Sequence, residues 1–198
     1  MNNNQLTGLN ILGTFAFSII ALMNKEITVF YMLYLFWWQA VIEIAANFIQ
    51  LLRLKLPLRI AFAHLKHVAF LLGIYFIFIM VIFGIIFSYS NSDLFTINVQ
   101  VFAFRNTSFV INILLFLGLT TFSLLRSKNP EVSVNAGIFT PKLIILHMSI
   151  VLGAFLHFGI RHFYPESFND SIYPYFLSAI PFLLLQTYFA WKTREVTS

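Results

Sequence analysis

Long apolar stretches separated by short polar connections dominate the pattern along the chain. An α-helix needs roughly 20 consecutive apolar residues to cross the hydrocarbon core of a bilayer, and each stretch is about that long. The stretches lie at residues 6–23, 27–52, 68–88, 107–125, 143–160 and 172–191. The pattern therefore predicts an all-α fold over residues 1–198, a polytopic membrane helix bundle with six transmembrane helices in a single integral membrane domain.

The first stretch follows MNNNQLT, which has no basic residue, so we expect a retained span and not a removed signal peptide. Only residues 24–26 separate it from the second stretch, which predicts a tight helical hairpin. An earlier start of the third helix, near Ile60, stays open, with Lys66 reaching to the membrane interface.

The connection at residues 89–106 has two readings. Its FTINVQV segment alternates with the period of a strand, whereas a second set of apolar positions has helical spacing. That set is Leu94, Ile97, Val101 and Phe104. An isolated strand would leave backbone groups unpaired near lipid, so the sequence favours a short amphipathic helix on the outer leaflet.

Composition supports lipid as the main solvent. The chain is 60% apolar and only 10% charged, and its mean hydropathy is +0.86. Soluble domains are closer to one quarter charged. The absence of cysteine excludes disulfides, thiolate metal ligands and a cysteine nucleophile.

The distribution of basic residues predicts the topology. Lys25, Arg105 and Arg161 are the only basic residues of the first, third and fifth connections. The other connections and the C-terminal tail hold Arg53, Lys55, Arg59, Lys66, Arg126, Lys128, Lys142, Lys192 and Arg194. Because basic residues favour the cytoplasmic side, both termini are expected in the cytoplasm. The net charge of +5 thus reflects topology and not nucleic-acid binding.

Four polar residues interrupt the second stretch on one helical face: Gln39, Glu43, Asn47 and Gln50. A carboxylate near the middle of a membrane helix costs about 2.5 kcal/mol or more, so Glu43 should face protein or water. This face predicts a polar interior that binds or passes a small polar solute, an ion or a proton. The alternative is that Glu43 is protonated, or hydrogen-bonded to Gln39, Asn47 or another helix, and only holds the bundle together.

Histidines form the second set of candidates. His64, His67 and His147 are expected near the cytoplasmic ends of their spans, where neutral imidazoles can bind a divalent metal or haem or transfer protons. Their spacing is not diagnostic of a metal site, and histidines that hydrogen-bond at the interface are the favoured reading. On the external side, His157, Arg161 and His162 form a patch that fits the mouth of a pathway, a lipid headgroup site or, as the favoured reading, a solvated loop.

Other catalytic templates are missing, including a P-loop and the GxGxxG and GxSxG motifs. An enzyme is therefore less favoured than a transport or binding protein, and no cofactor is the first expectation. Two alternatives stay open: an integral membrane enzyme or haem or metal protein that uses the cytoplasmic histidines, and a non-catalytic membrane subunit or effector. Homo-oligomers are compatible with either.

The segment FWWQAVIEIAANFIQLLR, followed by a basic connection and a span that contains KHVAFLLGIYF, resembles a family of small bacterial multi-pass membrane proteins of unknown function. Phe36, Trp37, Asn47 and Arg53 match the family pattern, while Gln39 stands where the family has an acid. The resemblance implies a multi-pass protein of the bacterial inner membrane and no particular reaction.

Overall fold

The computed structural model of the chain describes residues 27–54, 57–88, 92–126 and 141–163, together with Gly13, Leu184, Leu185 and Tyr188. These residues are helical except at the turns and ends between helices. The described part of the chain is therefore all-α, as the sequence predicts. The predicted spans at 6–23 and 172–191 lie outside the described residues, apart from those isolated positions.

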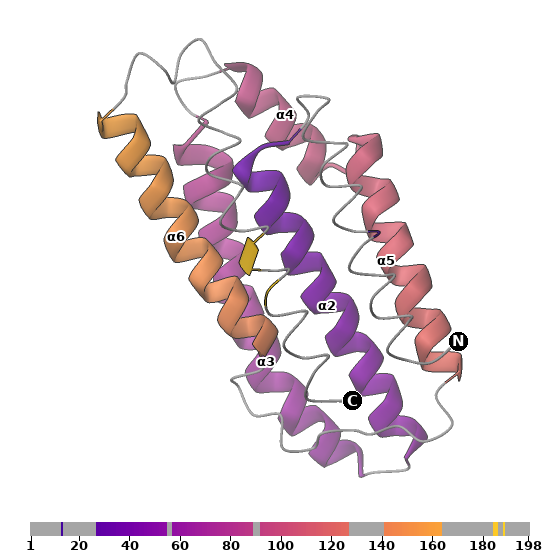
Figure 1. Cartoon of the computed structure of the whole chain (residues 1–198). Coiled ribbons are helices and arrows are strands. Elements are labelled where there is room, and N and C mark those ends of the chain that lie inside the picture. Colours follow the sequence, from indigo (N-terminus) through magenta and orange to yellow (C-terminus); the bar gives the residue numbers. More distant parts are fainter. Residues whose placement is uncertain are drawn as a thin grey trace.

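Helix α2 (Val29–Arg53) is the centre of the bundle, and it contacts α3, α5 and α6 (Figure 1). It begins at Thr28, whose side-chain oxygen accepts a hydrogen bond from the backbone N–H of Tyr31 at 3.0 Å. This is the usual way in which a threonine caps a helix N-terminus. Every residue from Val29 to Phe36 is buried.

Helix α3 (Leu58–Phe78) runs directly into a π-helical segment, η1 (Ile79–Ile86). The backbone bond from the N–H of Phe87 to the carbonyl of Ile82, at 3.0 Å, has the five-residue separation of a π-helix. The earlier start that the sequence left open is confirmed, since α3 begins at Leu58. Gly84 in η1 lies against the Phe30 ring of α2, where an added Cβ would be 3.2 Å from that ring.

Three further helices complete the described bundle. The short helix α4 (Ser92–Phe102) lies at the end of the bundle where α2 begins, and α5 (Thr107–Arg126) and α6 (Pro141–Phe163) flank α2 on different sides (Figure 1). The helical reading of the 89–106 connection is confirmed by α4. Of its predicted apolar stripe, Val101 is fully buried and Phe104 is exposed.

The outer surface of the described bundle is strongly apolar. Phe70 is 72% exposed and Phe155 is 74% exposed, as expected for side chains that contact lipid. Three helical stretches are long and apolar enough to cross a membrane, Val29–Arg53, Leu65–Ile86 and Ser92–Arg126, the last of which contains α4 and α5. In α6 the apolar part is the shorter segment Leu146–Leu156. These features indicate an integral membrane protein in contact with the lipid bilayer.

Aromatic rings from α2 fill the core between the helices. The Tyr34 ring stacks on Phe109 of α5 with 5.3 Å between ring centroids, and on Phe30 with 5.4 Å. Trp37 packs 5.0 Å from Phe76 of α3 and donates its indole N–H to the backbone carbonyl of Leu72 at 2.8 Å. These contacts fix α2 between α3 and α5, and so they fix the direction of its polar face.

Candidate functional site

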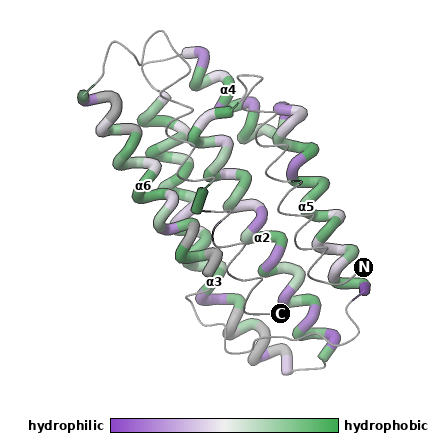
Figure 2. The backbone as a smooth tube through the Cα atoms, viewed as in Figure 1, coloured by the Kyte–Doolittle hydropathy of each residue, from purple (hydrophilic) through white to green (hydrophobic). Residues whose placement is uncertain are grey.

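The polar residues of α2 lie mainly in its second half, as the hydrophilic positions along the tube in Figure 2 show. They differ in burial. Gln39 is 3% exposed, Glu43 and Gln50 are half-buried, and Asn47 is exposed. The face therefore runs from the packed interior at Gln39 toward the end of the helix, where the described helices leave it open.

Glu43 takes the position that the spacing predicts, one turn from both Gln39 and Asn47. It is half-buried within the described part of the bundle, so these helices cover its side chain only in part.

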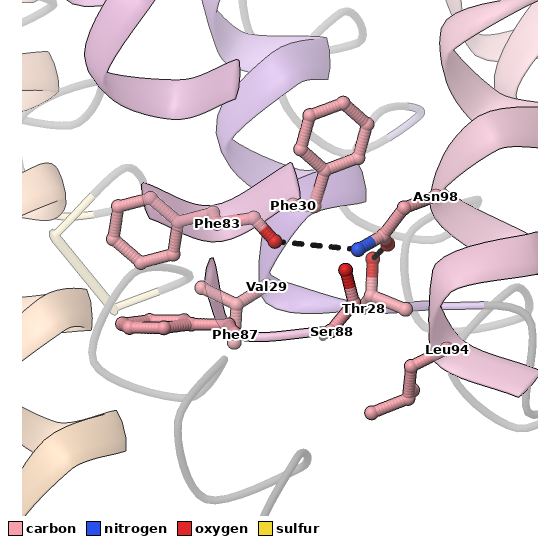
Figure 3. A pocket seen from close by; sticks show the side chains of 8 residues that line it. All are labelled: Thr28, Val29, Phe30, Phe83, Phe87, Ser88, Leu94 and Asn98. Carbon is pink, nitrogen blue, oxygen red and sulfur yellow. Dashed lines mark hydrogen bonds between the residues drawn. The ribbon is translucent and has the colours of Figure 1, made fainter. Parts of the chain in front are cut away.

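A second polar cluster lies where α2 begins, and it consists of Thr28, Ser88 and Asn98 (Figure 3). The Thr28 hydroxyl donates to the Oδ1 atom of Asn98 at 2.7 Å. The Nδ2 atom of Asn98 donates to the backbone carbonyl of Phe83 at 3.3 Å. Asn98 thus joins α4 to both α2 and η1.

The end of η1 explains why these side chains are needed. In an α-helix the carbonyl of Phe83 would accept from the N–H of Phe87, but that N–H bonds to Ile82 instead. The N–H of Ser88 likewise bonds to Ile85 and not to Gly84. Asn98 supplies a donor to the carbonyl of Phe83, and the Ser88 hydroxyl supplies one to the carbonyl of Gly84. Buried carbonyls need such partners.

A small cavity of about 20 Å³ adjoins this cluster. Its walls combine the three polar side chains with apolar ones, as Figure 3 shows: Thr28, Ser88, Asn98, Val29, Phe30, Phe83, Phe87 and Leu94. A volume of roughly 10–15 Å³ on this measure is enough for one water molecule. The cavity therefore has the size and the polar groups of a water site and is too small for an organic solute.

A third polar contact joins α2 to α5. Asn112 is 1% exposed, and its Nδ2 atom donates to the Tyr31 hydroxyl at 3.0 Å and to the Ser108 carbonyl at 3.0 Å. Its Oδ1 atom is buried and has no hydrogen-bond partner among the described residues. Asn112 thus keeps a buried acceptor on the side of α2 that carries Tyr31.

The histidines of the predicted metal site belong to α3 and α6. His67 is exposed on α3, and His147 is exposed on α6, with its ring 5.9 Å from that of Tyr75. His64 belongs to α3, but its side chain lies outside the described part. Among the described residues, no three histidine, aspartate or glutamate side chains lie close enough together to hold a metal ion. The metal or haem site stays a prediction.

The predicted external patch lies near the end of α6. His157 and Arg161 belong to that helix, but their side chains lie outside the described part of the chain. His162 is exposed, and its ring is 5.1 Å from that of Phe163. Its role at the mouth of a pathway stays a prediction.

Sequence reasoning missed the polar cluster and Asn112. The signal for Asn112 is present, because a single amide inside an apolar span is as unusual as Gln39. Thr28, Ser88 and Asn98 carry no such signal, since hydroxyls and amides are common at helix ends. They form a cluster only because the fold brings α4 against the beginning of α2 and the end of η1.

Comparison of the chain with protein-family models, with curated proteins and with solved structures finds no match. The resemblance carried by Phe36, Trp37, Asn47 and Arg53 therefore stays a prediction from the sequence.

Proposed function

We propose that this chain is a six-helix membrane protein that binds or passes a small polar solute, an ion or a proton, with Glu43 as the group that binds it. The observation that carries the proposal is the position of Glu43, which is half-buried on the central helix of the bundle, one turn from the buried Gln39. An amide would hold helices together at lower cost than an acid. We therefore propose that the carboxyl group of Glu43 itself binds the transported species.

The neighbouring amides suit such a role. Gln39 and Asn47 lie one turn on either side of Glu43, within the reach of side chains at this spacing. Carboxamides offer both donors and acceptors, so they can orient a bound solute or the protonated form of the acid. Gln50 extends the same set toward the cytoplasmic end of the helix.

A flux assay tests the role of Glu43. The purified full chain in liposomes should transport protons or a small cation. Glu43→Gln should lower that flux by about tenfold or more, because losing about 1.4 kcal/mol of binding free energy weakens binding tenfold. Asp93→Asn is the matched control, because it removes an exposed acid from α4 and leaves the spans unchanged. If Glu43→Gln keeps full flux while Glu43→Leu only lowers thermal stability, the residue is structural and the proposal is wrong.

The proposed topology places both termini and the 53–67 and 126–142 connections in the cytoplasm. The chain has no cysteine, so single cysteines report position without a background. Arg59→Cys should react with a membrane-impermeant thiol reagent only after the cells are opened, whereas Asp93→Cys should react in intact cells. Labelling of Arg59→Cys in intact cells would contradict the topology.

The competing readings predict other results in the same preparation. A haem protein absorbs visible light, and a metal enzyme retains its metal through purification, so a spectrum and a metal analysis identify either one. A subunit or effector without transport activity gives no flux with the intact chain. Each outcome replaces the proposal by a named alternative.

A further inference from the structure

The buried polar groups in the first half of α2 lie on the same face as Gln39 and Glu43. Along α2 the face is formed by Thr28, Tyr31, Leu35, Gln39 and Glu43, at spacings of three, four, four and four residues. Residues three or four apart are neighbours on a helix. The polar face that the sequence indicates in the second half thus continues to the beginning of the helix.

This face is long enough to cross the bilayer. Thr28 and Gln50 are 22 positions apart, which corresponds to about 33 Å at 1.5 Å per residue, against a hydrocarbon core of about 30 Å. Among these five residues, Leu35 is the one with an apolar side chain. Leu35 is 3% exposed, and it lies one turn after Tyr31 and one turn before Gln39.

We propose that protons are the species that this face carries and that Leu35 is the barrier that closes it in the structure described here. The inference rests on the proposed function of Glu43 and narrows its substrate. Protons enter through the polar cluster at Thr28, Ser88 and Asn98 and pass Tyr31 and Asn112. Glu43 accepts one proton from that side and releases one proton to the other side, so the carboxylate is restored in each cycle.

The size of the cavity and the chemistry of the polar side chains around it favour protons over larger solutes. The cavity of about 20 Å³ beside Thr28, Ser88 and Asn98 accommodates one water molecule and no hydrated cation. Hydroxyl groups both donate and accept hydrogen bonds, so with water between them they can pass a proton. The buried Oδ1 atom of Asn112, which has no partner among the described residues, is an acceptor for such a water.

Leu35 fits the role of a barrier because short apolar constrictions stop conduction by excluding water. The turn around it is tightly packed, since every residue from Val29 to Phe36 is buried. Conduction then requires a movement that admits water past Leu35. Shortening this side chain, or giving it a hydroxyl, should have the same effect without that movement.

The test measures proton entry into liposomes that contain the full chain and a trapped pH-sensitive dye, with the membrane potential set by potassium and valinomycin. Leu35→Ala and Leu35→Thr should each raise the proton flux by about threefold or more over the unmodified chain. Leu33→Ala is the matched control. Leu33 is also fully buried on α2, but it lies two residues away and so on the opposite face.

The outcomes separate this inference from the proposed function. Raised flux with both Leu35 variants and unchanged flux with Leu33→Ala supports the barrier. If Glu43→Gln abolishes flux while neither Leu35 variant raises it, Glu43 keeps its role and the barrier is wrong. If sodium moves and protons do not, the choice of substrate is wrong. If Leu33→Ala and Leu35→Ala raise the flux equally, the effect is general loosening, which also overturns the inference.

Discussion

The two halves of α2 differ in what surrounds them, although they form one continuous helix. In the first half, Val29–Phe36, every residue is buried, and the polar group of Tyr31 is bonded to Asn112 of another helix. In the second half, residues 41–50 are all half-buried or exposed. The first half thus packs against the neighbouring helices, and the second half carries the acid and amide side chains that are only partly covered.

One membrane helix can thus hold the bundle together with its first half and carry polar side chains on its second half. Lipid is as apolar as the core, so packing contacts and hydrogen bonds hold the helices together instead of a hydrophobic driving force. The stacked rings of Phe30, Tyr34 and Phe109 supply such contacts in the first half. With the helix fixed there, the second half can carry an acid and amides that contribute less to packing.

Removing one aromatic ring from each half of α2 should lower the stability of the protein by different amounts. Phe30 is fully buried and stacks on Tyr34, so Phe30→Ala should lower the free energy of unfolding by about 3 kcal/mol through the cavity it leaves. Phe48, in the second half, is half-buried and packs 5.4 Å from the exposed ring of Phe62. Phe48→Ala should cost about 1 kcal/mol.

Unfolding by sodium dodecyl sulfate in mixed micelles, followed by tryptophan fluorescence, measures both variants. The comparison between the halves predicts a clear difference between the two midpoints. Equal losses of stability would mean that the second half of α2 is packed as tightly as the first half, and the two halves would then not differ in packing.

The sequence predicted the helices of the described bundle because bilayer thickness sets the length of an apolar span. The predicted stretches 27–52 and 107–125 correspond to Val29–Arg53 and Thr107–Arg126. The π-helical segment was beyond such reasoning. IMVIFGII is apolar throughout, so its pattern cannot distinguish a five-residue from a four-residue hydrogen-bond separation.

The candidate site was predictable where a polar group interrupts an apolar run. Gln39 and Glu43 stand out for this reason, and the polar interior that they predict stays a prediction. The bond between Thr28 and Asn98 joins residues 70 positions apart, and it depends on where α4 packs. Tertiary arrangement, and not local pattern, creates this part of the site.

A smaller change in stability is expected from replacing two glycines, Gly84, which lies against a buried ring, and Gly73, which has open space around it. An added Cβ at Gly84 would be 3.2 Å from the buried Phe30 ring, whereas at Gly73 of α3 it would meet nothing within 4 Å. Alanine favours a helix by about 1 kcal/mol over glycine, and overpacking a buried contact costs about 1–3 kcal/mol. Gly84→Ala should therefore destabilise the protein by about 1 kcal/mol net, while Gly73→Ala should leave it unchanged or slightly more stable.

The same unfolding assay measures the two glycine variants, and a double variant identifies the cause. If the Phe30 ring is what the new methyl group meets, Phe30→Leu should make room for it, so Gly84→Ala should cost less in that background than in the unmodified chain. An undiminished cost in the Phe30→Leu background would assign the effect to the π-helical backbone of η1. The tight packing ascribed to the first half of α2 would then not extend to its contact with η1.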